Sequence, residues 1–228
     1  QRAFLRNLER GEAYQQEAPS LWDVTFQTAV AQAELEDRER PSAYHKLKFT
    51  LTGASAEDGD DAAIWIDTTR PELVPSCVAL VAHPDDERYT EVVGRTALVP
   101  MLDRPIPVIA DDYVDREFGT GALKITPAHD PNDYEIGTRH DLAIINVMAP
   151  DASISIDHGW PAEENPGDNA DLKPLVGLAR EEARKQIVIW FKNHDLMQEV
   201  KPYRHAVGHS YRSHVPVEPY YTDQWYVK

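Results

Sequence analysis

The sequence has 228 residues, of which 42% are hydrophobic and 27% are charged, a balance typical of a folded globular protein with a buried core. The net charge of −16 excludes a general nucleic-acid binder, because such a surface repels a polyanion, so any contact with RNA has to be local. The single cysteine, Cys77, excludes an internal disulfide framework. No apolar run approaches the roughly 20 residues that span a bilayer, and we expect a cytoplasmic protein without a membrane partner.

The first quarter of the chain is predicted to hold a helix, a strand and a turn. Apolar residues between Arg2 and Gln15 follow helical spacing. The stretch Ala29–Arg40 predicts a strand or short helix that ends before Pro41. Apolar and polar residues alternate over Tyr44–Thr52, which indicates a half-buried strand, and an acidic turn is expected at residues 55–61.

Short runs with strand composition dominate the middle of the chain, and turn residues separate them. The runs are residues 63–66, 78–82, 97–99, 106–109, 122–126 and 144–147. Many short strands punctuated by Pro and Gly are typical of a barrel or sandwich. The pattern therefore predicts a mainly β fold with α+β decoration.

Two further helices are expected. Asp130 is a suitable N-cap, and Pro131 a suitable first helical residue, for a helix that ends near His140. Residues 175–196 carry an apolar stripe, with acidic residues early and basic residues late, which is typical of an amphipathic helix. The last segment, residues 210–228, is aromatic-rich and is expected to be extended.

Three motifs stand in a fixed order: Thr68–Glu72 (TTRPE), Val81–Tyr89 (VAHPDDERY) and Phe118–Glu135. Their order and separation resemble the editing domain that is inserted in the class I aminoacyl-tRNA synthetases for valine, isoleucine and leucine. The run from Lys124 to Asp130, followed by Asp133, resembles the valine enzymes most closely. The resemblance implies a closed β-barrel editing domain with peripheral helices.

The same resemblance covers nearly the whole chain and implies its organisation. Residues 1–43 would lead in from a catalytic domain, residues 44–200 would form the editing domain, and residues 201–228 would return to the catalytic domain. We read the sequence as a piece of a longer protein.

The implied activity is hydrolysis of threonine wrongly esterified to tRNA(Val), by direct attack of water on the ester. The implied partners are the 3′ aminoacyl end of tRNA(Val) and the rest of the synthetase. No cofactor is expected for the domain itself. ATP and Mg²⁺ would serve the synthetic domain, whose nucleotide-binding signature is absent from this sequence.

The resemblance assigns roles to two aspartates. Asp133 would bind the α-ammonium of the substrate through a charge-assisted hydrogen bond, although an aspartate in the first turn of a helix can instead interact with the helix dipole. Asp130 would recognise the threonine hydroxyl, and the alternative is plain N-capping. Both roles of Asp130 can hold together, because a carboxylate has about four acceptor sites.

Lys124 and Thr126 lie two residues apart on an expected strand, so their side chains face the same side. Lys124 would lie near the adenosine or an acidic residue of the pocket, or else it is an exposed edge-strand lysine. Thr126 would bind the substrate or the attacking water, or else it reflects β-propensity alone. With Asp133, these two residues are our candidate catalytic residues.

Five further residues are candidates for substrate binding. Thr68 and Thr69 would donate hydroxyls to the ester, and Arg70 would bind the terminal nucleotide, unless this segment is only a strand end with a surface arginine. Phe118 would stack on adenine, or it is a core aromatic residue. His129 is a possible general base, and a structural histidine is the equal alternative.

Two departures from the family pattern stand out. Leu73 follows Glu72 where the pattern has a threonine, which removes one hydroxyl from the loop. The flanking stretches 22–26 and 210–213 hold no cysteine, whereas many relatives carry zinc-binding pairs there, so no metal site is expected. The alternatives are an isoleucine-type editor that removes valine, a non-catalytic module that docks the tRNA acceptor end, and an unrelated acidic β-barrel.

Overall fold

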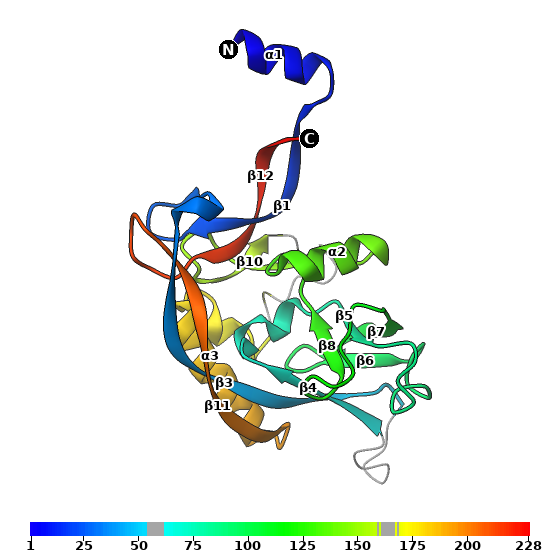
Figure 1. Cartoon of the computed structure of the whole chain (residues 1–228). Coiled ribbons are helices and arrows are strands. Elements are labelled where there is room, and N and C mark those ends of the chain that lie inside the picture. The colour runs from blue at the N-terminus through cyan, green and yellow to red at the C-terminus, as the bar shows by residue number, and fades with distance from the viewer. Residues whose placement is uncertain (54–61, 159, 161–166, 168) are drawn as a thin grey trace.

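A computed structural model describes residues 1–53, 62–158, 160, 167 and 169–228 (Figure 1). The acidic turn expected at residues 55–61 lies outside the described residues. None of the described helices is long and apolar enough to cross a membrane. The fold is an arm, formed by both ends of the chain, joined to a body that contains three further sheets.

The arm begins with helix α1 (Arg2–Glu9), which leads into strand β1 (Ala13–Asp23). Strand β1 pairs along almost its whole length with β12 (Glu218–Val227) and at its end with the short β2 (Thr28–Ala29). The prediction of a helix as far as residue 15 is therefore correct for α1 but wrong after it, because residues 14 and 15 pair with the last strand. The extended structure predicted near the C-terminus is confirmed by β12.

The longest strands of the body form one twisted ribbon. A single 3-10 turn, η1 (Gln32–Glu34), precedes β3 (Leu35–Thr50), which pairs with β11 (Met197–Ser210) on one side and β4 (Ala63–Thr68) on the other. The expected end before Pro41 is wrong. Strand β4 pairs only with residues 45–50 of β3, so Pro41 lies where β3 has a partner on one side only, a position in which a missing N–H is tolerated.

A four-stranded sheet lies beside this ribbon, with the strands in the order β6 (Thr96–Val99), β7 (Arg104–Ala110), β5 (Ala79–Ala82) and β8 (Ala122–Ile125). The pair β5–β7 is parallel, and the other two pairs are antiparallel. A separate hairpin joins β9 (Asn146–Met148) to β10 (Ile154–His158). The strands predicted from the short apolar runs are confirmed, with shifts of one or two residues at their ends.

The expectation of a mainly β fold closed into a barrel is wrong. The protein is a mixed α/β structure with open sheets. Strands β4 and β8 lie close together, but no ladder joins them among the described residues, and one isolated bridge, Leu51 to Ala97, connects β3 with β6. The alternation of short strands and turns predicted the strands themselves. Closure of a sheet into a barrel depends instead on pairs between strands far apart in the chain, which this local pattern does not reveal.

Helices and 3-10 turns cover the sheets. These elements are two helices, α2 (Pro131–Arg139) and α3 (Arg180–Asn193), and two 3-10 turns, η3 (Pro71–Ser76) and η4 (Lys173–Leu175). Helix α2 and its Asp130 N-cap confirm the prediction. Helix α3 begins later than expected, because the chain turns at Gly177 with φ of +83° before the helix can start.

The main core lies between the ribbon, the four-stranded sheet and α3. Leu47, Phe49, Ile66, Leu80 and Phe191 are almost completely buried in it. The predicted boundaries at residues 44 and 201 fall inside β3 and β11, and the proposed division into incoming, editing and return segments stays a prediction.

Helix α3 supplies a stability test of this core. Replacement Phe191→Ala removes a fully buried ring and is expected to lower the free energy of unfolding by about 3–5 kcal/mol. The matched control is Ile189→Ala on the same helix, whose side chain is 50% exposed and should change stability little. Urea unfolding followed by tryptophan fluorescence measures both, and equal losses would show that α3 does not close the core.

Candidate functional site

Two carboxylates lie at the start of helix α2, close to the end of strand β8. Asp130 Oδ1 accepts hydrogen bonds from the backbone N–H groups of Asn132 (2.8 Å) and Asp133 (3.2 Å). Asp133 Oδ2 accepts from the Thr126 backbone N–H (2.8 Å) and the Thr126 hydroxyl (3.1 Å). Lys124 Nζ donates to the Thr126 hydroxyl at 3.4 Å. The structure therefore brings the four predicted residues of this motif together.

Each carboxylate uses one oxygen in these contacts. Asp130 Oδ2 and Asp133 Oδ1 accept no hydrogen bond from any residue that the structure describes. Both side chains are only partly exposed. Two oriented acceptor oxygens are thus left at one corner of the protein, where they can receive donors from a ligand.

The protonation of Asp133 is set mainly by its burial. Burial raises the pKa of Asp133 to about 6, the neighbouring Asp130 adds to this rise, and Lys124 and the hydrogen bonds from Thr126 oppose it. Asp133 is therefore mostly ionised at neutral pH, but a cationic ligand at this carboxylate would stabilise the charged form further.

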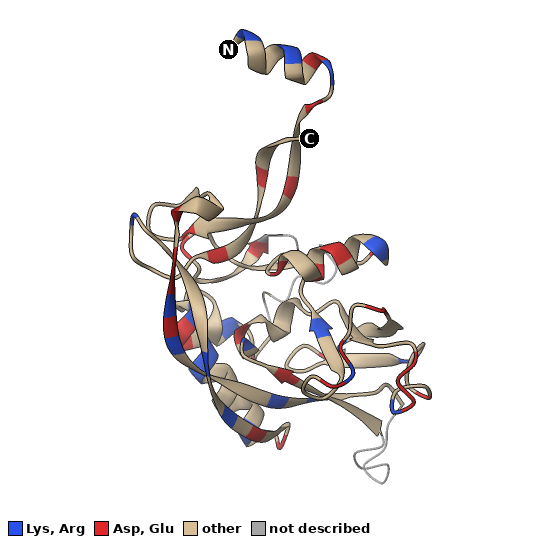
Figure 2. Ribbon diagram, viewed as in Figure 1, with Lys and Arg blue, Asp and Glu red and all other residues tan. Residues whose placement is uncertain are grey.

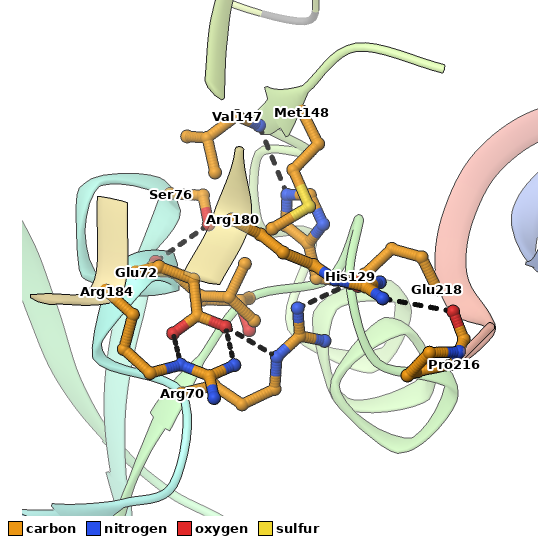
Figure 3. A network of polar contacts seen from close by, with 12 residues as sticks. Arg70, Glu72, Ser76, His129, Val147, Met148, Arg180, Arg184, Pro216 and Glu218 are labelled. Carbon is orange, nitrogen blue, oxygen red and sulfur yellow. Dashed lines mark hydrogen bonds and ion pairs between the residues drawn. The ribbon is translucent and has the colours of Figure 1, made fainter. Parts of the chain in front are cut away.

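His129 lies behind this corner and is almost completely buried. Its Nε2 accepts a hydrogen bond from the Val147 backbone N–H at 3.1 Å (Figure 3). Burial lowers the pKa of His129 well below its ordinary value, and the positive charges of Arg70 and Lys124 lower it further. His129 is therefore a neutral imidazole whose Nε2 is already occupied, an arrangement typical of a structural histidine.

Three of the other predicted residues, Thr68, Thr69 and Arg70, lie at the end of β4 and in the loop that follows it. Thr68 is buried, and its hydroxyl accepts from the Arg70 backbone N–H at 3.1 Å. Thr69, Arg70 and Arg184 are among the residues that line a cavity of about 200 Å³. The wall of this cavity includes neither Asp130 nor Asp133, which we call the acid pair. The threonine loop (Thr68–Glu72) and the acid pair are therefore neighbours around His129 rather than parts of one cavity.

Arg70 is held by two carboxylates, as Figure 3 shows. Its Nε lies 3.1 Å from Glu72 Oε1, and its Nη2 lies 2.6 Å from Glu218 Oε1. Glu72 is fully buried and also receives a bidentate contact from Arg184 at 2.7 and 2.8 Å. Glu218, from strand β12, in turn binds Arg180 of α3 at 2.7 Å. These five residues, the Arg70 network, join the loop after β4 to helix α3 and to the arm.

The sequence contained a weak signal for this network. Glu72 belongs to the TTRPE motif, and Arg180 and Arg184 lie four residues apart, so they share one face of a helix. The long sequence separation from Glu72 to Arg184 and Glu218 hid the pairing. Sequence reasoning placed Arg70 near the nucleotide, whereas the structure places its guanidinium between two carboxylates.

Phe118 lies away from the acid pair, in the turn before β8. Glycines on either side of Thr120 adopt positive φ, +59° at Gly119 and +77° at Gly121, and this turn leaves the Phe118 ring 56% exposed. The ring contacts Tyr44 of β3, with 6.1 Å between centroids. An exposed aromatic face at this place remains suitable for stacking on a base.

Leu73 does not line the candidate site. Its side chain is almost fully buried in a small apolar cluster with Val147, Met148 and Ala152. A leucine at this position therefore contributes to the core, and the lost hydroxyl does not remove a donor from the acid pair.

The two cysteine-free flanking stretches meet at the base of the arm. Asp23 Oδ1 accepts from the backbone N–H groups of Thr25 (2.9 Å) and Phe26 (3.0 Å). Against the opposing effect of burial, the nearby hydroxyls of Ser210 and Ser213 help to lower the pKa of this carboxyl. Within the described ranges, no three His, Cys, Asp or Glu residues are grouped to hold a metal ion.

Comparison with known proteins identifies the family. A family model described as "Leucyl-tRNA synthetase, editing domain" matches residues 79–192, half of the chain. The chain belongs to this family of editing domains. The match includes β8, the acid pair and α2, but it begins after the threonine loop.

The relatives of this editing domain bear the name valine--tRNA ligase. The protein of Latilactobacillus sakei subsp. sakei (strain 23K) is 42% identical over 227 residues, which is 100% of this chain and 24% of the relative. Those of Prochlorococcus marinus (strain MIT 9313) and Listeria innocua serovar 6a are 42% and 40% identical, over 99% and 100% of this chain. The chain thus spans about a quarter of the length of these relatives. The resemblance to valyl-tRNA synthetases is confirmed, and the chain is the editing domain of a member of that family.

Among solved structures, the ternary complex of Agrobacterium radiobacter K84 agnB2 LeuRS-tRNA-LeuAMS overlaps with a TM-score of 0.46 and 14% sequence identity. The overlap covers 90% of this chain and 31% of that chain. This is a loose likeness.

The Arg70 network of the editing domain predicts a pH-dependent stability. Burial alone raises the pKa of Glu72, but hydrogen bonds from Arg184 and the charge of Arg70 outweigh it and set the pKa at about 2, below the ordinary 4.5. Glu72 therefore stabilises the fold above pH 4.5, and this contribution is lost as the pH falls through 4.5 towards 2. Replacement Glu72→Gln is expected to cost about 3–5 kcal/mol at neutral pH, and less on acidification.

Urea unfolding of the wild type and the variant at several pH values checks this expectation. The matched control is Glu181→Gln, because Glu181 also pairs with an arginine (3.1 Å) but is 56% exposed, and an exposed pair is worth at most about 1 kcal/mol. A pH-independent difference between Glu72→Gln and the wild type would contradict the assigned charge of Glu72.

Proposed function

We propose that this domain hydrolyses the ester of threonine wrongly attached to tRNA(Val). The observation that carries the proposal is the pair of carboxylates at the start of α2, each with one oxygen held by the protein and one oxygen without a partner among the described residues. Two such acceptors match the two donors that threonine presents near its ester, the α-ammonium and the side-chain hydroxyl.

In this proposal Asp133 binds the α-ammonium. Its pKa of about 6 leaves it ionised at neutral pH, and its charge would make a charge-assisted hydrogen bond with the ammonium. The two bonds from Thr126 fix the orientation of the carboxylate, and Lys124 fixes the Thr126 hydroxyl in turn. The reactive ester is thereby positioned relative to the protein, which supplies much of the rate.

Asp130 would select threonine over valine. The two amino acids are nearly isosteric, and an apolar pocket rejects an isostere with an added hydroxyl only weakly, for which valyl-tRNA synthetase with threonine is the known example. A second site that accepts the hydroxyl solves this problem. Valine would leave the Asp130 oxygen desolvated without a donor, a cost of about 1–3 kcal/mol.

The reaction needs no covalent intermediate. A water oxygen attacks the carbonyl carbon, the bond from that carbon to the ribose oxygen breaks, and the ribose oxygen takes up a proton, which yields threonine and a free tRNA end. Burial raises the pKa of the Cys77 thiol to about 11, so this residue is unsuited to act as a nucleophile. His129 is neutral and occupied by Val147, so we assign it no proton transfer.

The proposal extends to the partners and the setting of the domain. We infer that it acts on the 3′ aminoacyl end of tRNA(Val) as part of a longer synthetase in the cytoplasm. The relatives that support this inference are named valine--tRNA ligase. The domain itself would use no cofactor, whereas ATP and Mg²⁺ would serve the amino-acid activation site elsewhere in the synthetase.

The first prediction from the proposed function concerns Asp133. Replacement Asp133→Ala is expected to abolish hydrolysis of Thr-tRNA(Val), because the α-ammonium loses its anion. Asp133→Asn should also lose activity, although its amide oxygen can still accept the bonds from Thr126. Above pH 6 the Asp133 carboxylate is ionised, and burial makes this charge unfavourable in the folded protein. Removal of the charge in Asp133→Asn should therefore not lower the stability of the protein at pH 8. Single-turnover deacylation and urea unfolding measure the two effects, and wild-type hydrolysis by either variant would refute this role of Asp133.

A second prediction concerns the pH dependence of the reaction. The rate should fall as the pH drops through about 6, because protonation of Asp133 removes the charge that binds the ammonium. The pH profile of kcat/KM for deacylation checks this, because kcat/KM reports the pKa values of the free enzyme. A rate that stays constant from pH 7.5 down to about 4.5 would show that an ionised Asp133 is not required.

A third prediction concerns selectivity. Asp130→Ala should reduce the preference for Thr-tRNA(Val) over Val-tRNA(Val) by about 5- to 150-fold, which corresponds to the loss of one buried hydrogen bond. Competition between the two charged tRNAs measures the ratio. Asp130→Asn is the matched control, because its amide oxygen still caps α2. An unchanged ratio in the alanine variant would exclude Asp130 as the discriminating residue and would leave it as a helix cap.

A further inference from the structure

One face of the β11–β3–β4 sheet is turned away from the core. Side chains alternate along a strand, and Leu47 and Phe49 are buried in the core, so the even-numbered residues of β3 point outward. The register then places their partners on β4 and β11 on the same side. We call the part of this side that runs from Arg40 to Lys48 on β3, with its partners, the outer face: Arg40, Ser42, Tyr44, Lys46, Lys48, Trp65, Asp67, Glu199, Lys201, Tyr203 and His205.

Aromatic rings follow one another across the outer face. The Phe118 ring lies 6.1 Å from Tyr44, Tyr44 lies 4.6 Å from Tyr203, and Tyr203 stacks on His205 at 5.2 Å between centroids. Phe118 is 56% and Tyr203 is 38% exposed. Proteins bind unpaired bases with aromatic side chains that are open to solvent, because every base has a face that can stack on a ring.

Cationic side chains lie beside these rings. Lys46 and Lys48 lie over Trp65 at 6.0 and 5.6 Å, Lys201 is opposite Tyr44, and Arg40 is opposite His205. Asp67 and Glu199 lie on the same face, and Glu199 pairs with Lys201 at 3.1 Å. The outer face thus has four Lys or Arg side chains against two carboxylates, and interleaves them with aromatic rings.

This positive charge contrasts with the rest of the chain. The outer face holds four Lys and Arg against two Asp and Glu, whereas the whole chain holds 23 against 39. Figure 2 shows Lys and Arg along the β3–β11 ribbon and α3, and mainly Asp and Glu in the loops around the four-stranded sheet. A polyanion would be repelled by most of the molecule and attracted here.

The outer face also adjoins the candidate site. At one end, Phe118 leads through a short turn into β8, which carries Lys124. At the other end, Arg40 and His205 line the same cavity as Thr69 and Arg70. A strand of nucleic acid on the outer face would therefore arrive at the elements that hold the threonine loop and the acid pair.

We propose that the outer face binds the unpaired nucleotides at the 3′ end of the tRNA, with bases stacked on Tyr44 and Tyr203 and phosphates near Lys201 and Arg40. This inference rests on the proposed function, since it concerns how the same substrate is held. It explains how a chain of net charge −16 can bind RNA: the attraction is confined to one sheet face. Paired RNA does not fit this surface, because its bases already stack on one another.

Binding of a fluorescein-labelled RNA tetranucleotide, ACCA, to the 228-residue chain tests the proposal by fluorescence anisotropy. Tyr203→Ala should weaken binding about tenfold, by loss of one stacked base, while Tyr203→Phe should bind as the wild type does. Lys201→Gln should lower the salt dependence of binding by about 0.7 in the slope of log K against log salt. Arg204→Gln is the matched control: Arg204 is also exposed on β11 but faces the opposite side of the sheet.

Several results would overturn the proposal. These are the absence of tetranucleotide binding by the wild type, unchanged affinity in Tyr203→Ala, equal effects of Lys201→Gln and Arg204→Gln, or equally tight binding of a blunt RNA hairpin. The last result would point to a duplex as the occupant of the face.

Deacylation kinetics separate this inference from the proposed function. Tyr203→Ala should raise KM about tenfold and leave kcat unchanged, whereas Asp133→Asn should lose kcat. Hydrolysis by the wild type, with an unaltered KM in Tyr203→Ala, would reject the outer face and retain the deacylase. Tetranucleotide binding that depends on Tyr203, without hydrolysis by the wild type, would reject the deacylase and retain the outer face.

Discussion

The buried carboxylate of Glu72 is the contact on which the arrangement of the site depends. It carries a negative charge into a fully buried position, where only a strong positive partner makes the charge tolerable. Arg184 and Arg70 supply that partner from two sides. Because Arg70 also binds Glu218, the loop after β4, helix α3 and the arm are fixed relative to one another through one set of charges.

The acid pair uses a different principle, in which a carboxylate is only half satisfied by the protein. Each aspartate is oriented through one oxygen and presents the other. Burial disfavours the charged form of Asp133. A cation that approached the carboxylate would offset this cost by stabilising the charge. In the proposed function, such a site would bind an ammonium group with little rearrangement, since the backbone N–H groups of α2 and Thr126 already hold both side chains.

The sequence predicted most of what depends on local chemistry. The N-cap at Asp130, the strand runs and the association of Lys124, Thr126 and Asp133 are all encoded within about one or two turns of chain, a range over which capping and side-chain alternation decide the structure. The family resemblance also followed from contiguous motifs. The prediction of a barrel was wrong because closure depends on pairs between distant strands, and in the described part of the chain β4 and β8 approach without forming a ladder.

Long-range polar contacts were equally hidden in the sequence. Glu72 meets Arg184 across 112 positions, and no local pattern specifies which arginine a buried glutamate selects. Tyr44 and Tyr203 show the same limit, because their contact follows from the register of β3 with β11. Pro41 shows the reverse error: a proline read as the end of a strand is accommodated where one side of that strand has no partner.

The free edge of β11 has a further consequence for how the protein behaves in concentrated solution. Among the described residues, the outer edge of β11 is hydrogen-bonded to Val215 and Val217 only at its end, through Gly208 and Ser210. The rest of this edge offers backbone groups to which another chain could add, and such edges promote aggregation unless they are guarded. Pro202 lacks the N–H that an added strand would need, and the charged Lys201 and Arg204 flank it. Pro202 and its charged neighbours thus keep this edge from pairing with a neighbouring copy of the chain.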